Sequence, residues 1–162
     1  ADHTARVLEV VRLRRGKRVA VVSENDALVA AVREGARRLG LRCHELYRVE
    51  DLDLWRDQRV ASLAADVVVS RLEAVKGFEF DTVIACDLSD GVVPRPGTPP
   101  EENWRAAAVV YAALTRARDE LILTYVGRPS IFLEAMTEYV ETHDGAVGDG
   151  LAGWRTGRNV HP

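Results

Sequence analysis

The sequence predicts an α/β fold in which a mostly parallel sheet of about five strands carries helices on both faces. Short apolar runs, which are typical of buried parallel strands, alternate along the chain with amphipathic helical patterns. The first strand, helix and strand follow one another within about 30 residues and form a βαβ unit. A length of 162 residues suits one such domain with a single core.

The helices are predicted from apolar residues at helical spacing and from the residues that begin or end each pattern. Gly16 and Gly40 end the first two helices, and Ser23–Asp26 is a polar turn that suits the N-cap of the second helix. Pro129 and Ser130 open the last helix. The expected helices lie at Thr4–Arg15, at Ala27–Leu39, within Tyr47–Ala65 as one or two short helices, at Asn103–Arg118, and from Ser130 to about Val140.

The strands are predicted from continuous apolar runs, and they lie at Val19–Val22, Arg42–Leu46, Val67–Ser70, Thr82–Cys86 and Leu121–Val126. After the fourth strand, several Pro and Gly residues predict an irregular loop at Asp87–Glu102. Ligands of parallel sheets sit at the carboxyl ends of the strands. The stretches expected to carry function are therefore Ser23–Asp26, Arg71–Asp81, Asp87–Glu102 and the approach to Thr115–Arg118.

The domain is expected to cover residues 1–141, and residues 142–162 are expected to form a flexible tail, because glycines recur there without a strong pattern. The net charge of -3 excludes a basic nucleic-acid-binding module as a whole. Cys43 and Cys86 lie in apolar runs without metal-ligand spacing, so we expect two reduced thiols, no metal site and a cytoplasmic protein. No apolar segment approaches the ~20 residues that span a bilayer, and we expect no membrane partner.

Two stretches have residues suited to a phosphate-containing ligand. Tyr111–Arg118 is expected to end a helix with Arg116 and Arg118, which cannot share one helix face, and a guanidinium delivered beside a sheet edge suits a phosphate. In the loop before the fourth strand, Gly77 lets the main chain approach a ligand and Glu79 can accept hydrogen bonds from hydroxyls such as those of ribose. On composition alone, a turn glycine and two solvated acids explain the second stretch better than a ligand site does. The chain contains no Gly-x-x-x-x-Gly-Lys-Ser/Thr loop for a triphosphate, so self-contained nucleotide hydrolysis is not expected.

The order of these stretches resembles a known family. Val75–Asp81 (VKGFEFD) resembles motif V of UvrD/Rep-type superfamily 1 helicases, usually AKGLEFD, and Tyr111–Arg118 (YAALTRAR) resembles their motif VI, usually YVALTRAR. Asp87–Pro94 is similar to a family segment that ends in Glu-Gly-x-x-Pro, and Arg128–Leu133 is similar to Pro-Ser-Arg-Phe-Leu. The resemblance is specific over about Val67–Leu133 and weak over Val19–Leu46, where motif IV would lie.

The resemblance implies that the chain is the C-terminal RecA-like motor lobe, domain 2A, of an ATP-dependent DNA helicase or translocase, without the 2B insertion of larger relatives. It implies that Arg116 is an arginine finger, that Glu79 holds the ribose, and that Gly77 lies beside the phosphates of ATP. It also implies that ATP with Mg²⁺ is held mainly by an N-terminal RecA-like lobe absent from this chain, that the isolated chain is inactive, and that the other partner is single-stranded DNA. DNA repair is the process that such helicases suggest.

Departures from the family pattern concern the DNA contacts. Where the family usually has Thr-x-His ahead of motif V, this chain has Arg71 and Glu73. Arg71 suits a DNA phosphate, whereas Glu73 would repel one. An alternative hypothesis is therefore a RecA-like lobe kept as a non-catalytic binding or regulatory module. A free-standing dinucleotide-binding domain is disfavoured, because Ser23–Asp26 stands where a Gly-x-Gly-x-x-Gly would be needed.

Overall fold

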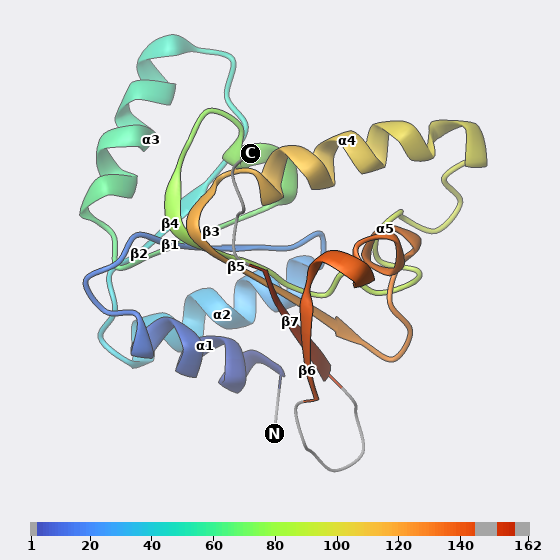
Figure 1. The fold of residues 1–162 in the computed structure, drawn as a ribbon. Coiled ribbons are helices and arrows are strands. Elements are labelled where there is room, and N and C mark those ends of the chain that lie inside the picture. Colours follow the sequence, from blue (N-terminus) through green and yellow to red (C-terminus); the bar gives the residue numbers. More distant parts are fainter. Residues whose placement is uncertain (1–2, 145–151, 158–162) are drawn as a thin grey trace.

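A computed structural model describes residues 3–144 and 152–157 of the chain. In this part, a seven-stranded sheet has the order β2-β3-β1-β4-β5-β7-β6 (Figure 1). The first five strands are parallel and β7 and β6 are antiparallel additions beside β5. The strands are β1 Val19–Val22, β2 Cys43–Leu46, β3 Val67–Ser70, β4 Phe80–Ala85, β5 Ala117–Val126, β6 Glu141–Asp144 and β7 Ala152–Gly157.

Helices cover both faces of this sheet, which confirms the predicted α/β class (Figure 1). Side chains of α1 and α2 pack on one face, and those of η1, α4 and α5 pack on the other. A single helix, α3, joins β2 to β3, so no further subdomain is inserted there. The helices are α1 His3–Leu13, α2 Asp26–Arg38, α3 Leu52–Ala64, α4 Asn103–Leu114 and α5 Ile131–Ala135, with 3-10 helices η1 Leu72–Val75, η2 Pro100–Glu102 and η3 Thr137–Tyr139.

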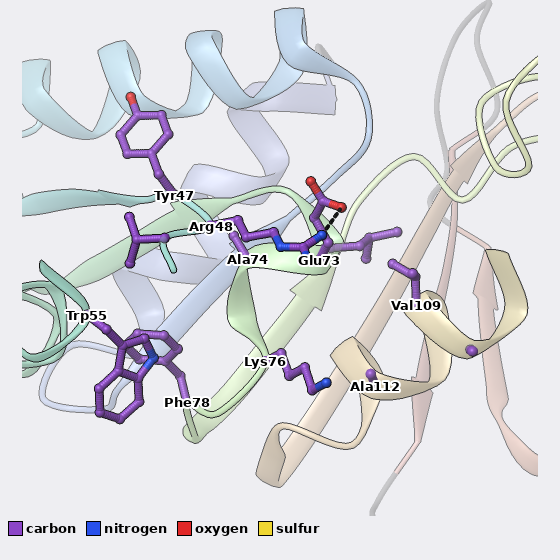
Figure 2. A pocket seen from close by; sticks show the side chains of 12 residues that line it. Tyr47, Arg48, Trp55, Glu73, Ala74, Lys76, Phe78, Val109 and Ala112 are labelled. Carbon is purple, nitrogen blue, oxygen red and sulfur yellow. Dashed lines mark ion pairs between the residues drawn. The ribbon is translucent and has the colours of Figure 1, made fainter. Parts of the chain in front are cut away.

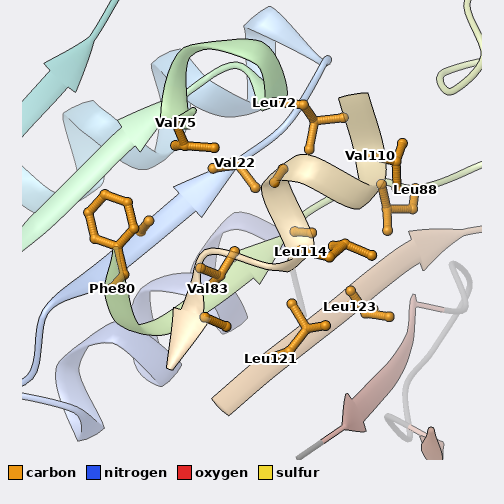
Figure 3. Close-up of a cluster of buried hydrophobic side chains, with 14 of the residues drawn as sticks. Val22, Leu72, Val75, Phe80, Val83, Leu88, Val110, Leu114, Leu121 and Leu123 are labelled. Carbon is orange, nitrogen blue, oxygen red and sulfur yellow. The ribbon is translucent and has the colours of Figure 1, made fainter. Parts of the chain in front are cut away.

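The buried core is divided by the sheet into two clusters, because successive side chains of a strand point to opposite faces. In β1, Val19 and Val21 join the cluster under α1 and α2, whereas Ala20 and Val22 join the cluster under α4. Figure 3 shows the second cluster, in which Val110 and Leu114 of α4 lie against Leu121 and Leu123 of β5. Together these clusters hold the starts of β1, β4 and β5 in fixed positions.

The boundary between α4 and β5 differs from the sequence-based expectation. The helix was expected to reach Arg118, but it ends at Leu114 and β5 begins at Ala117, where it pairs with Phe80 of β4. Ala117 and Arg118, which the helical pattern seemed to include, therefore belong to the parallel strand β5. Arg116 lies in the turn and Arg118 lies in the strand, so this turn, and not the two faces of one helix, separates the two side chains.

The C-terminal region also differs from expectation where the structure describes it. Glu141–Asp144 and Ala152–Gly157 are the strands β6 and β7, and β7 pairs with β5 from Leu121 to Val126. The expectation of a patternless tail was wrong for these residues, because antiparallel pairing uses main-chain groups and needs no apolar periodicity. The rest of the expected tail, residues 145–151 and 158–162, lies outside the described residues, and the domain boundary at residue 141 stays a prediction. Among the described helices, none is both long and apolar enough to cross a membrane.

Candidate functional site

A cavity of about 310 Å³ lies at the edge of the sheet where β1, β4 and β5 begin. It brings together Gly77, Glu79 and Arg116, the three residues that the sequence predicts to contact a nucleotide. The other lining residues are Arg18, Arg59, Leu63 and Phe78. The cavity thus joins residues from four separate segments of the chain, and its charged lining consists of three guanidinium groups and one carboxylate.

The location of the cavity corrects one expectation from the sequence. The site was expected at the carboxyl ends of the strands, but Arg18, Glu79 and Arg116 each stand immediately before a strand and lie at the amino ends. The rule for carboxyl ends describes sheets that hold a whole ligand in the crevice above them. Glu79 and Arg116, which the motifs predict, precede β4 and β5 and therefore lie at the opposite edge.

Arg116 is held by the end of α4. Its main-chain N–H donates to the Ala113 carbonyl (3.1 Å), and its Nε donates to the Ala112 carbonyl (3.1 Å). One terminal nitrogen, Nη2, donates to the hydroxyl of Thr115 (3.2 Å). A cation at a helix C-terminus is favourable, and the half-buried guanidinium forms no ion pair with an acid of the described residues. The Arg116 side chain is therefore held in place by these hydrogen bonds, and its positive charge is available to an anion.

The loop before β4 presents Gly77 and Glu79 to the cavity. Gly77 has a φ of +88°, a left-handed conformation that favours glycine. An added Cβ would lie 3.6 Å from Cζ2 of Trp55, which is ordinary contact, so the demand for glycine comes from the backbone. Phe78 and Phe80 are buried and Glu79, which lies between them, is exposed. Glu79 and Arg116 are neighbours in the ladder, because the Phe80 N–H donates to the Arg116 carbonyl (2.9 Å).

Arg18 and Arg59 also line the cavity, and the sequence reasoning did not assign them to a site. The Arg18 main chain is fixed by Asp81, whose carboxylate accepts the Arg18 N–H (2.8 Å), and the guanidinium carbon lies 5.6 Å from the centre of the Phe80 ring. Arg59 lies 5.5 Å from the centre of the Trp55 ring. The available signal was the position of Arg18 immediately before the first buried strand. It was hidden because Arg18 follows other basic residues that a helix C-terminus explains.

Arg71 is not part of this cavity. It follows β3 at the carboxyl edge, where its Nε and Nη2 donate to the two carboxylate oxygens of Asp26 (3.0 and 3.1 Å). Glu73 lies 4.0 Å from a nitrogen of Arg48. The two departures from the family pattern therefore already have partners of opposite charge. Arg118 is exposed and forms no ion pair with an acid of the described residues.

A second cavity, of about 440 Å³, lies on the face of the sheet between α3 and α4. Figure 2 shows Trp55 and Phe78 on one side, Val109 and Ala112 of α4 on the other, and Lys76 between them. Phe78 lines both cavities, and its ring centre lies 5.6 Å from that of Trp55. The two cavities are therefore separated by this aromatic pair.

The largest pKa shifts, those of Asp66 and Cys86, lie away from both cavities, in a structural ion pair and in the core. A side-chain hydrogen bond from Arg42 lowers the pKa of Asp66 to about 2, and one from Arg14 lowers the pKa of Glu120. Burial raises the pKa of the Cys86 thiol to about 12. These groups stabilise or fill the fold. Among the described residues, no three His, Cys, Asp or Glu side chains gather as a metal site would require.

Comparison with known proteins points to the same family as the motifs do. The sequence profile of the UvrD-like helicase C-terminal domain matches residues 43–128, which is more than half of the chain. Two curated relatives, each described as a probable DNA helicase II homolog, come from Rickettsia conorii and Rickettsia felis; each is 26% identical over 100 residues, covering 59% of this chain. The matched region spans only 15% of the length of these relatives.

Two solved structures are similar to this chain. The C-terminal domain of a possible DNA helicase from Lactobacillus plantarum is 17% identical, with a TM-score of 0.49, and the match covers 80% of this chain and 70% of that one. Magnesium protoporphyrin IX methyltransferase from Synechocystis is 14% identical, with a TM-score of 0.52, and the match covers 96% of this chain and 77% of that one. At such low identity the second likeness shows a shared α/β architecture alone.

Proposed function

The chain belongs to the UvrD-like helicase C-terminal domain family, and from this premise we propose that it is the second motor lobe of an ATP-dependent superfamily 1 DNA helicase or translocase. The observation that carries the proposal is the shared cavity of Gly77, Glu79 and Arg116. Arg116 is 37 residues beyond Glu79, yet a main-chain hydrogen bond next to Glu79 fixes the two together. The cavity supplies the donors and the acceptor that a nucleotide needs at one edge of a motor lobe.

In this proposal, Arg116 is the arginine finger. ATP with Mg²⁺, held mainly by the first lobe, supplies the phosphoryl group that is transferred to water. As charge builds on the phosphoryl oxygens, the guanidinium of Arg116 stabilises it. Because the Nε of Arg116 is held by the Ala112 carbonyl, the terminal nitrogens are oriented before the ligand arrives. This preorganisation lowers the cost of reaching the transition state.

Glu79 and Gly77 have binding roles in the same proposal. The exposed carboxylate of Glu79 accepts hydrogen bonds from the ribose hydroxyls, and the absence of a side chain at Gly77 lets its main chain lie beside the phosphates. These contacts orient the nucleotide toward Arg116. Since the phosphate loop and the Mg²⁺ ligands belong to another lobe, the isolated chain is expected to have negligible ATPase activity.

DNA contact belongs to a different edge of the lobe. Arg71 stands at the carboxyl ends of β1 and β3, away from the cavity, and single-stranded DNA is the partner proposed there. Asp26 must release the guanidinium, or share it, before Arg71 can bind a DNA phosphate. The contribution of Arg71 to DNA affinity is therefore expected to be small.

The proposal is tested with the DNA-stimulated ATPase of the full-length protein that contains this chain. Arg116→Ala is expected to lower kcat by roughly 10³-fold or more, the usual scale for an arginine finger. Glu79→Ala is expected to raise KM for ATP by about tenfold, because a charge-assisted hydrogen bond to ribose is lost. Arg118→Ala is the matched control, since this exposed arginine lies outside the cavity and should leave turnover unchanged. Near-normal turnover of Arg116→Ala would refute the finger assignment.

A non-catalytic binding or regulatory module is the second candidate. It is favoured by the ion pairs Arg71–Asp26 and Arg48–Glu73, which already neutralise basic groups near the carboxyl edge. The two candidates differ in what precedes this lobe in the full-length protein. A motor requires a Gly-x-x-x-x-Gly-Lys-Thr loop and nucleotide turnover, whereas a module that has neither would retain binding to a protein partner only.

A further inference from the structure

Arg18 presents an unpaired cation to the cavity from the side of β1. Its Nε is buried and has no hydrogen-bond partner. Its side chain forms none of the ion pairs among the described residues, in contrast to Arg14, Arg42 and Arg71. Because the Arg18 side chain is half-buried, lines the cavity and forms no ion pair, its charge is available to an anion that enters the cavity.

The charge of the cavity points to the same ligand chemistry. Arg18, Arg59 and Arg116 contribute three positive charges, and Glu79 contributes the only carboxylate in the lining. The carboxylate of Asp81 accepts the Arg18 main-chain N–H, and Asp81 lies outside the lining. The excess of cations favours a polyanion over a neutral ligand or a basic peptide.

The sheet places Arg18 and Arg116 on opposite sides of β4. β1 and β5 are both direct neighbours of β4, with Val19 and Glu120 both aligned with Thr82. With strands ~4.8 Å apart, β1 and β5 lie roughly 10 Å apart across β4. Arg18 and Arg116 both line the cavity, so one elongated anion can contact both from opposite sides of β4, and the Phe80 ring supports the guanidinium of Arg18.

From these observations we propose that Arg18 is a second phosphate-contacting arginine of the nucleotide site, acting from β1 while Arg116 acts from the end of α4. The inference rests on the proposed function, because it takes the anion to be the phosphate chain of a nucleoside triphosphate. Arg18 binds phosphate oxygens through its terminal nitrogens and sets affinity for the triphosphate. It takes no part in proton transfer.

The test measures equilibrium binding of a fluorescent, non-hydrolysable ATP analogue to the full-length protein, with inorganic tripolyphosphate and adenosine as competitors. Arg18→Met and Arg18→Gln remove the charge but keep a long stem against Phe80. Both are expected to weaken binding of the analogue and of tripolyphosphate by about 10- to 100-fold, the scale of hydrogen bonds to charged groups, and to leave adenosine affinity unchanged. Arg18→Lys, which keeps a point charge without the planar fork, should recover part of the affinity.

Lys17→Met is the matched control, because it removes one positive charge from the adjacent exposed residue, which does not line the cavity. Equal affinities of Arg18→Met, Lys17→Met and wild type would overturn the inference. So would an equal loss for adenosine and tripolyphosphate, or a loss confined to single-stranded DNA. A melting curve of each variant identifies misfolding. If Arg18→Met and Arg18→Gln both misfold, Arg18→Lys is the deciding variant. An affinity for the analogue between those of wild type and Arg116→Ala supports the inference, and an affinity equal to that of wild type overturns it. Failure of wild type to bind the analogue would instead refute the proposed function.

Discussion

The backbone conformation of Gly77 allows a quantitative test of the loop that precedes β4. At a φ of +88°, any residue with a Cβ is strained, and a left-handed conformation costs an L-residue roughly 1–2 kcal/mol. Alanine also lowers the conformational entropy of the unfolded chain, which offsets about 0.4–1 kcal/mol. The new Cβ would meet Trp55 at 3.6 Å, which adds no clash. Gly77→Ala is therefore expected to lower the free energy of unfolding by about 1 kcal/mol.

Urea denaturation measures this change. With a slope of about 2 kcal/mol per molar urea, a loss of about 1 kcal/mol moves the midpoint down by about 0.5 M, while the slope itself stays unchanged. Gly16→Ala is the matched control, because Gly16 has a φ of +85° and an added Cβ there has no neighbour within 4 Å. The two variants should shift alike. A midpoint at or above that of wild type for Gly77→Ala would refute the strain argument, and a far larger loss than for Gly16→Ala would refute the claim that Trp55 leaves room.

Two further predictions concern titratable groups outside the cavity. Because a hydrogen bond from Arg14 lowers the folded-state pKa of Glu120, this group stabilises the fold above its unfolded pKa of about 4.3, and the stabilisation is lost as pH falls through the lower folded value. Wild type should thus lose more of its urea midpoint between pH 6 and pH 3 than Glu120→Gln, and parallel losses would contradict this. Burial raises the pKa of Cys86 to about 12, so iodoacetamide at pH 8 should label half-buried Cys43 before Cys86, as followed by mass spectrometry. Equal native-state labelling rates would show that Cys86 is accessible.

The parallel part of the sheet could be predicted from sequence because its strands are buried on both faces. Runs such as Val19–Val22 and Val67–Ser70 have no polar alternation, and this is the signature of a strand covered by helices on each side. The predicted bounds of these two strands match the structure. By contrast, β7 contains Gly153 and Gly157 and pairs through its main chain, so its sequence had no comparable signal.

The candidate site was predictable to the extent that its residues fall within motifs. Gly77, Glu79 and Arg116 were identified by their order and spacing, and the cavity contains all three. Arg18 was not identified, because its proximity to Glu79 depends on β1 lying next to β4, and the order of strands in a sheet is a long-range property. The edge of the sheet was also predicted wrongly, since a general rule for ligand position was applied to residues that precede their strands.

Phe80 contacts both Arg18 and Arg116, and this limits which substitutions the cavity can accept. Its N–H holds the carbonyl of Arg116, its ring supports Arg18, and its side chain is 1% exposed within the core. A substitution at this position would disturb both guanidinium groups at once, together with the packing beneath them. The two arginines therefore cannot be repositioned independently by changing residue 80. In the proposed nucleotide site, a change that affects only affinity or only turnover is expected to require substitution of Arg18 or Arg116 itself.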